Sequence, residues 1–145
     1  MSTATPTVWP ELPIDQIRLD GGTQPRATID RDTVESYADD MRAGHQFPPV
    51  SVYHDGDTYW LADGFHRLHA AQVAGRDTIA AAVTTGTRRD AILHAAGANA
   101  AHGLRRTNAD KRRAVAMLLA EPTWAKRSDR WIATKAGVGP DLVGD

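Results

Sequence analysis

Short blocks of hydrophobic residues alternate with polar ones along this chain, and their composition predicts several β-strands. Residues 50–53 and 58–61 are rich in β-branched and aromatic side chains, and Asp55-Gly56 lies between them. An Asp-Gly pair between two such blocks is a strong signal for a β-hairpin. Residues 12–17 and 78–84 predict two further short strands.

Between these blocks, hydrophobic positions recur with the spacing of an α-helix. One such segment follows Asp30 or Asp32, either of which can cap its first turn, and Gly44 ends it. Residues 65–74 form a second helical segment, which Gly75 closes. The N-terminal part therefore predicts a mixture of strands and helices.

Two Thr-x-x-Asp sequences in the C-terminal part predict the starts of two more helices. At residues 87–90 and 107–110 the threonine and the aspartate can form an acidic variant of the capping box. The first helix is expected to run through Ala100, and Glu121-Pro122 stops the second. Residues 128–143 then have the rhythm of a helix-turn-helix whose second helix is incomplete.

Length and composition are those of an ordinary globular protein of about one domain. The chain has 145 residues, of which 41% are hydrophobic and 24% charged, and its apolar runs are too short to span a membrane. The absence of cysteine excludes disulfides, thiolate metal sites and a cysteine nucleophile. No signal-peptide pattern precedes Pro10, so we expect a cytoplasmic protein without a membrane partner.

Charge is divided unevenly along the chain. Residues 1–85 hold 6 lysines and arginines against 12 aspartates and glutamates, whereas residues 86–135 hold 11 against 4. Nucleic-acid affinity depends on local basic patches, so a polyanion would bind the second segment. The cations predicted to contact DNA are Arg105, Arg106, Lys111, Arg112, Arg113 and Lys135. The alternative is an arginine-rich helical surface that is merely solvated.

The most informative stretch for chemistry is the predicted strand, turn and helix at residues 60–70. A helix that begins at a glycine turn presents backbone N–H groups and the positive end of its dipole, which together favour an anion. His66 and Arg67 would lie in this first turn, where arginine can pair with phosphate and histidine can donate a hydrogen bond or move a proton. One alternative is a tight turn with two solvated side chains. Another is a metal site at Asp63, His66 and His69, for which the sequence shows no supporting partner.

Three short sequences together resemble the characteristic boxes of the N-terminal domain of ParB-type proteins, whose fold is shared with sulfiredoxin. Pro25-Arg26 resembles the Gln-Pro-Arg box, and Asn99 resembles the asparagine of the third box. Gly64 and Arg67 match the first and fourth positions of the Gly-Glu-Arg-Arg box. The resemblance covers nearly the whole chain and implies an α+β fold with a small mixed sheet. It also implies a site for a nucleoside di- or triphosphate at Arg26, Gly64, His66, Arg67 and Asn99.

The chain departs from these boxes at positions that carry charge in the family. Phe65 stands where a glutamate is expected, His66 replaces an arginine, and Ala98 stands where a carboxylate is expected. Magnesium prefers carboxylate oxygen, so we predict neither a metal site nor a magnesium-dependent CTP clamp. Sulfiredoxin has the active-site loop Gly-Cys-His-Arg, and replacement of its cysteine by Phe65 excludes repair of a cysteine sulfinic acid.

The predicted organisation has three segments. These are a disordered start at residues 1–7, a ParB/sulfiredoxin-like domain at 8–86, and a helical DNA-binding region with an incomplete helix-turn-helix at 87–145. The expected function is that of a DNA-binding regulator or partition-type protein whose partners are DNA and a nucleotide. The alternative is a nucleotide-dependent phosphotransferase or phosphodiesterase in which His66 is the acid/base, Asp63 assists and Arg67 holds phosphate. A third alternative is a dimerising interaction module with the same fold.

Overall fold

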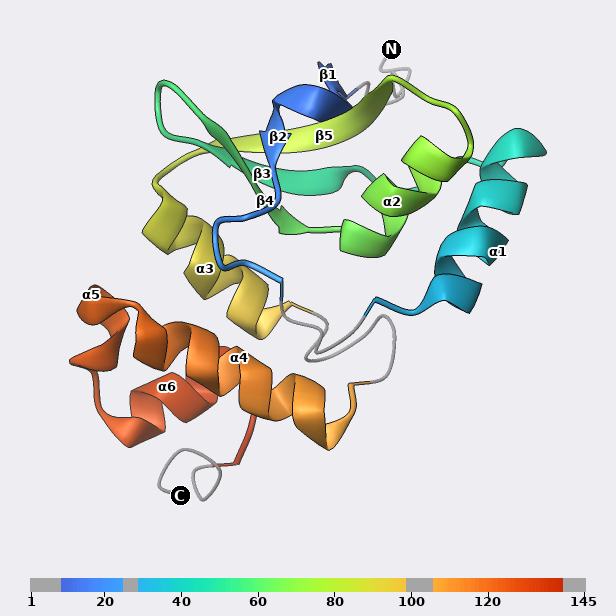
Figure 1. Ribbon diagram of the computed structural model, residues 1–145. Helices are drawn as coiled ribbons and strands as arrows, with labels where there is room; N and C mark the ends of the chain where they lie inside the picture. Colours follow the sequence, from blue (N-terminus) through green and yellow to red (C-terminus); the bar gives the residue numbers. More distant parts are fainter. Residues whose placement is uncertain (1–8, 25–28, 99–105, 140–145) are drawn as a thin grey trace, which may run out of the picture.

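A five-stranded sheet with two adjoining helices is followed along the chain by a group of helices (Figure 1). The computed structural model describes residues 9–24, 29–98 and 106–139. The strands are β1 (Glu11–Pro13), β2 (Ile17–Arg18), β3 (Val50–His54), β4 (Tyr59–Asp63) and β5 (Thr78–Thr85), in the sheet order β1-β5-β3-β4-β2. Because β3 is antiparallel to β4 and parallel to β5, the sheet is mixed, and the predicted α+β class is confirmed.

The N-terminal segment forms both edges of this sheet. A single strand was predicted over residues 12–17, and this prediction is wrong because a 3-10 helix, η1 (Ile14–Gln16), separates β1 from β2. The backbone N–H of Ile14 donates to the carbonyl of Asp77 at 2.9 Å, and the Ile14 side chain is buried. After this turn β2 pairs in parallel with β4, whereas β1 pairs antiparallel with β5 at the opposite edge.

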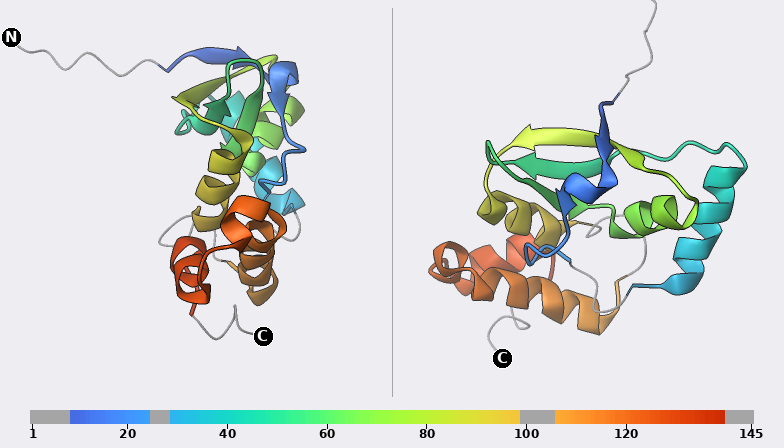
Figure 2. Two further views of the ribbon diagram at one scale, coloured as in Figure 1. Left: turned by 90° about the vertical axis from the view of Figure 1, so that its left-hand side faces the viewer. Right: turned by 45° about the horizontal axis from the view of Figure 1, so that its top comes forward.

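Two helices, α1 (Arg31–Arg42) and α2 (Phe65–Val73), lie side by side next to the sheet (Figure 2). The predicted cap of α1 is confirmed at Asp30, whose carboxylate accepts hydrogen bonds from the N–H groups of Asp32 and Thr33. The core between helices and sheet contains the completely buried side chains of Ala38, Val50, Val52, Leu61 and Leu68. Burial of each larger aliphatic side chain contributes roughly 1.5–3 kcal/mol, so this core fixes α2 against the sheet.

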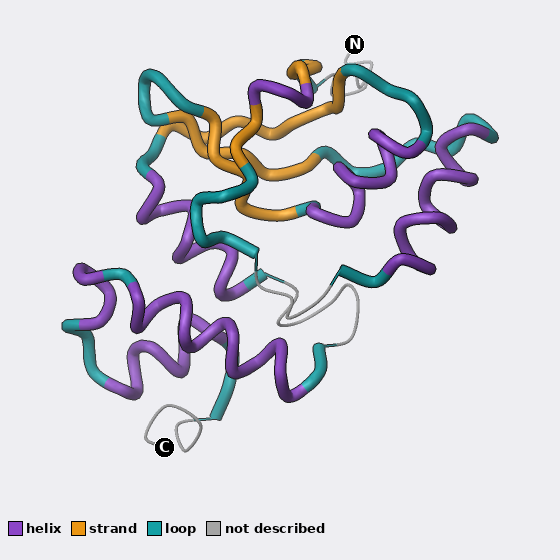
Figure 3. The backbone as a smooth tube through the Cα atoms, viewed as in Figure 1, coloured by secondary structure: helices purple, strands orange, loops and turns teal. Residues whose placement is uncertain are grey.

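The remaining helices form a second core, and the chain contains only helices and loops after β5 in the described part (Figure 3). They are α3 (Arg88–Gly97), α4 (Asn108–Ala120), α5 (Pro122–Ala125) and α6 (Asp129–Ala136). Both predicted capping boxes are confirmed, at the starts of α3 and α4. Ile92, Leu118 and Ile132 join α3, α4 and α6 in the core of this group. The second helix of the predicted helix-turn-helix lies outside the described residues.

The predicted hairpin between β3 and β4 is confirmed, and Asp55 organises its turn. The Asp55 carboxylate accepts hydrogen bonds from the N–H groups of Asp57 at 2.9 Å and Thr58 at 2.7 Å, and from the indole Nε1 of Trp60 at 3.0 Å. These donors, with the Thr58 N–H the strongest, stabilise the charged form and lower the pKa of Asp55 from 3.8 to about 2.

This pKa predicts a loss of hairpin stability in acid. Because the folded-state pKa lies below that of the unfolded chain, the stabilisation is complete above about pH 4 and is lost as the pH falls towards 2. We expect an NMR titration of the Asp55 carboxyl to have its midpoint near the lower value, and Trp60→Phe to raise that midpoint by removing one donor. A midpoint at the ordinary aspartate value in the unaltered protein would contradict the prediction.

Candidate phosphate site and nucleic-acid interface

The turn that leads from β4 into α2 requires glycine at position 64. Gly64 is the N-cap residue of α2 and has φ 103°, in the left-handed region, so the predicted helix start is confirmed. A Cβ atom at this position would lie 2.5 Å from Cγ1 of Val50 and 3.0 Å from Nη2 of Arg67. Gly64 provides no side-chain cap to the N–H groups of the first turn, which suits them to bind an anion.

Phe65, the first residue of α2, is directed into the core. Its side chain is 6% exposed and packs with the buried residues of the sheet and α1. An aromatic side chain in this position has no oxygen for a cation. It adds apolar contacts at the turn where the resembling family carries a glutamate.

His66 joins the start of α2 to the start of α1. The imidazole is buried, and its Nε2 accepts a hydrogen bond from the backbone N–H of Asp30 at 3.1 Å. A ring nitrogen that accepts this bond carries no proton of its own. Action of Nε2 as an acid or base would therefore require it to release the Asp30 amide.

Arg67 holds the loop before β3. Its Nη1 donates to the carbonyl oxygens of Pro48 at 2.7 Å and Pro49 at 2.8 Å, and its Nη2 lies 3.6 Å from Oδ2 of Asp63. The side chain is only 17% exposed. In this arrangement the guanidinium charge is already matched by a carboxylate and two carbonyls, so Arg67 orders the backbone around the turn.

The segment that leads to Pro25-Arg26 is held beside β4 and α4. Thr23 is completely buried and donates from its hydroxyl to the carbonyl of Leu61. Arg113 donates from Nε to the carbonyl of Gln24 at 2.6 Å. Pro25 and Arg26 themselves lie outside the described residues, but on their other side Asp30 is bonded to His66. Both flanks of the first box are therefore fixed close to the β4–α2 turn.

The flanks of the third box contact the C-terminal end of α6. A Cβ atom on Gly97 would lie 2.7 Å from the carbonyl oxygen of Lys135. Arg106 donates from Nη1 to the carbonyl of Ala136 and from Nη2 to that of Gly137, each at 2.9 Å. Asn99 and Arg105 lie between these flanks, outside the described residues.

The cations predicted to contact DNA have different surroundings. Arg106 and Arg113 donate to backbone carbonyls, and Nζ of Lys135 lies 5.7 Å from the ring centroid of Trp131. Arg112 is exposed and Lys111 is half-buried. The type and chain position of these cations were predictable from the sequence. The tertiary roles of Arg106 and Arg113 were missed, because the carbonyls that they bind are distant in the chain.

Neither a metal cluster nor a membrane span is found within the described ranges. No three His, Cys, Asp or Glu side chains there gather closely enough to hold a metal ion, so Asp63, His66 and His69 form no such group. No helix in those ranges is long and apolar enough to cross a membrane.

Among known protein families, the ParB N-terminal domain matches residues 2–100 of this chain. Transcriptional regulator NovG of Streptomyces niveus is 36% identical over 97 residues, which are 66% of this chain and 29% of NovG. A possible regulatory protein of the streptomycin biosynthesis operon of Streptomyces griseus is 31% identical over 103 residues, 70% of this chain and 28% of that protein. The chain thus spans less than a third of the length of these curated relatives.

Solved structures show the same fold. Chromosome-partitioning protein ParB of Caulobacter crescentus, complexed to the centromeric parS site, has a TM-score of 0.55 at 21% identity, covering 93% of this chain and 68% of the ParB chain. The same protein with CTP-γ-S gives 0.54 at 23%, covering 92% and 73%. Sulfiredoxin of Arabidopsis thaliana gives 0.51 at 28%, covering 61% and 97%. The predicted resemblance to both folds is confirmed, and the chain belongs to the ParB N-terminal domain family.

Proposed function

We propose that this chain is the ParB-like part of a DNA-binding regulator or partition-type protein, with a nucleotide-phosphate site at the start of α2. The names of the two curated relatives describe a transcriptional regulator and a possible operon regulator, and a ParB of the same fold is known in complex with DNA. These likenesses support the regulatory function, and the contacts of the residues that flank the boxes support a nucleotide site linked to it.

The observation that carries this proposal is the set of contacts around the boxes. The first box is flanked by Gln24 and Asp30, which bind α4 and α2 through Arg113 and His66. The third box is flanked by Gly97 and Arg106, both of which meet the end of α6. A ligand bound by the two boxes and the start of α2 would therefore also affect the positions of α4 and α6. In this proposal α6 precedes the element that reads DNA.

Backbone N–H groups, and not only charged side chains, would hold the nucleotide. The N–H groups after Gly64 would bind phosphate, and Arg26 and Asn99 would supply further donors from the first and third boxes. Arg67 would act mainly by keeping the turn in place, because its Nη1 already donates to two carbonyls and its Nη2 faces the carboxylate of Asp63. With Phe65 buried, we expect nucleotide binding to depend little on magnesium. The occupied Nε2 of His66 gives no support to the phosphotransferase alternative.

DNA binding is tested by fluorescence anisotropy with duplex DNA at increasing salt. The logarithm of the association constant should fall linearly with the logarithm of the salt concentration, because each neutralised phosphate releases counterions. Arg112→Gln should weaken binding to all duplexes alike and reduce the slope by about one, since Arg112 is exposed. Absence of binding to any duplex at about 50 mM salt, in this chain and in a longer form, would contradict the proposed function.

Nucleotide binding is tested by calorimetry with CTP, ATP and GTP, each with magnesium and with EDTA. Arg26→Ala should lower the affinity about tenfold or more, because a charge-assisted hydrogen bond is worth roughly 1.5–3 kcal/mol. The matched control is Arg31→Ala, which removes an exposed arginine from the first turn of α1. Equal affinities in the two variants would exclude Arg26 from the site, and a strict requirement for magnesium would contradict our interpretation of Phe65.

A further inference from the structure

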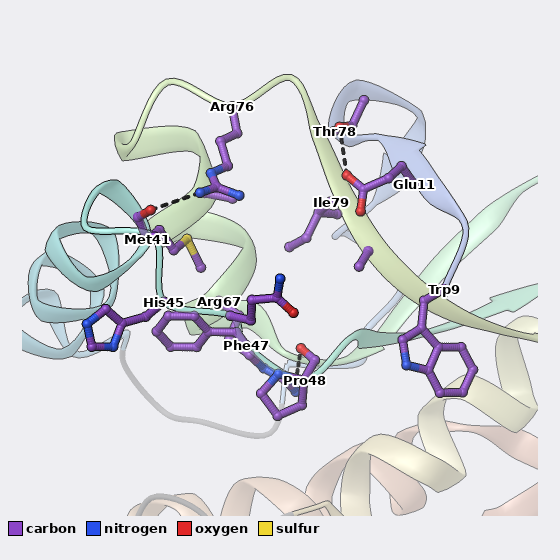
Figure 4. A pocket seen from close by; sticks show the side chains of 14 residues that line it. Trp9, Glu11, Met41, His45, Phe47, Pro48, Arg67, Arg76, Thr78 and Ile79 are labelled. Carbon is purple, nitrogen blue, oxygen red and sulfur yellow. Dashed lines mark hydrogen bonds between the residues drawn. The ribbon is translucent and has the colours of Figure 1, made fainter. Parts of the chain in front are cut away.

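A cavity of about 510 Å³ lies beside α2, between the loop after α1 and strands β1 and β5 (Figure 4). We propose that it binds a small aromatic carboxylate, at a second ligand site that shares only Arg67 with the proposed nucleotide site. Its walls come from residues 9–11, 41–48 and 76–80 together with the inner face of α2. From α2 the cavity is lined by Arg67 and Ala71. Of the residues that line the cavity, only Arg67 belongs to one of the three boxes.

The size of the cavity and its two aromatic side chains suit a small ligand with a planar ring. Volumes of 300–1,000 Å³ are typical of sites for small molecules. Phe47 and Trp9 approach from opposite sides, and Ile79 lies between them (Figure 4). The Phe47 ring packs against Tyr37, with 5.1 Å between the ring centroids, whereas Trp9 is 42% exposed. Aromatic walls of this kind favour a planar ring, which gains by stacking.

The charged groups of the cavity favour one acidic group on that ligand. Arg76 is exposed and donates from Nη2 to the carbonyl of Met41 at 2.9 Å, the one hydrogen bond of its guanidinium within the described ranges. Its other N–H groups are in position to pair with a carboxylate. The charge of Arg67 is matched by Asp63, so Arg76 is the cation that lacks a carboxylate partner among the described residues of the cavity.

Glu11 limits how much negative charge the cavity accepts. Its carboxylate lies on the β1 side, where Oε1 accepts a hydrogen bond from the hydroxyl of Thr78 at 3.0 Å. A triphosphate would be repelled by this carboxylate, whereas a single carboxylate beside Arg76 would not need to approach it. The cavity therefore differs in specificity from the start of α2.

The probes that test this inference are indole-3-acetate and benzoate, with indole-3-acetamide, tryptamine and inorganic phosphate as comparisons. Binding is measured by calorimetry and located by amide chemical-shift changes on the full chain. Indole-3-acetate should bind and shift amides of residues 45–47 and 76–80. The uncharged amide and the amine should bind at least about tenfold more weakly, because neither can pair with Arg76 as an anion.

Two arginine variants separate binding from stability. Arg76→Gln should lower the affinity for indole-3-acetate about tenfold or more. Arg42→Gln is the matched control, because Arg42 of α1 also donates from Nη2 to a backbone carbonyl, that of Val73 in α2, at 2.8 Å. Arg42 does not line the cavity. Phe47→Leu should lower the affinity for both carboxylates, although the wall of the cavity remains apolar.

The outcomes are distinct from those of the nucleotide experiment. Nucleotide affinity should be unchanged in Arg76→Gln, and indole-3-acetate affinity should be unchanged in Arg26→Ala. The inference is overturned if neither carboxylate binds at millimolar concentration, if the amide binds equally well, or if the two arginine variants behave alike. Stronger binding of phosphate than of indole-3-acetate at the same amides would also overturn it.

Discussion

Alanine at position 64 is expected to lower the free energy of unfolding by about 2–5 kcal/mol, whereas alanine at position 56 should lower it by only about 1–2 kcal/mol. Gly64 and Gly56 have nearly the same φ, 103° and 101°, so both substitutions place a side chain in the same unfavourable φ region. They differ in space, because a Cβ on Gly64 would approach Val50 to 2.5 Å and one on Gly56 would meet nothing within 4 Å. The difference between the variants therefore measures the cost of overpacking at the turn.

Urea denaturation of the two variants and the unaltered chain measures this difference. The midpoint should fall furthest for Gly64→Ala, with a similar slope in all three proteins if each remains two-state. Nucleotide binding by the folded fraction of Gly64→Ala should also be lost, since the first turn of α2 cannot keep its position. Equal midpoints for the two variants would mean that Val50 moves aside without cost, and the tight turn would not be a constraint on the site.

Loss of Arg106 should loosen α6 more than loss of any exposed arginine. Arg106→Gln removes two charge-assisted hydrogen bonds to the carbonyls of Ala136 and Gly137, and we expect it to lower the free energy of unfolding by about 1–3 kcal/mol. Arg112→Gln removes the same charge from an exposed position and should change stability by less than about 0.5 kcal/mol. Amide hydrogen exchange should become faster in α6 in the first variant only.

The same pair of variants distinguishes charge from position in DNA binding. Both lose one cation, so a purely electrostatic role predicts equal losses of DNA affinity. If Arg106 also positions α6 for the reader that follows it, Arg106→Gln should bind more weakly than Arg112→Gln at every salt concentration. Identical hydrogen exchange in the two variants would contradict the structural role of Arg106, and identical DNA affinities would contradict the positioning of the reader by α6.

The elements that were predictable from the sequence are those specified by neighbouring residues. The capping boxes at Thr87 and Thr107 need only four residues each, and both form as predicted. The hairpin at Asp55 and the start of α2 at Gly64 are equally local. The strand predicted over residues 12–17 is interrupted because the chain leaves β1 beside β5 and crosses to β2 beside β4, a change of partner that local composition does not reveal.

The candidate site was less predictable because its side chains have distant partners. A histidine and an arginine after a glycine turn have the same local sequence whether they face a phosphate or the protein. His66 binds an amide 36 positions earlier, and Arg67 binds carbonyls 18 and 19 positions earlier. Residue type predicts hydrogen-bonding capacity, but only the packing of α1 and the loop before β3 decides how that capacity is used.

The short N-terminal segment also bears on self-association. It places β1, three residues long, along β5, and β2, two residues long, along β4, so one piece of chain borders the sheet on both sides. Unpaired strand edges are templates for aggregation, and natural proteins shield them with short or interrupted strands. Removal of residues 11–18 would uncover the eight-residue β5 and the five-residue β4 together. Resistance to intermolecular sheet formation therefore depends on a segment that belongs to none of the three boxes.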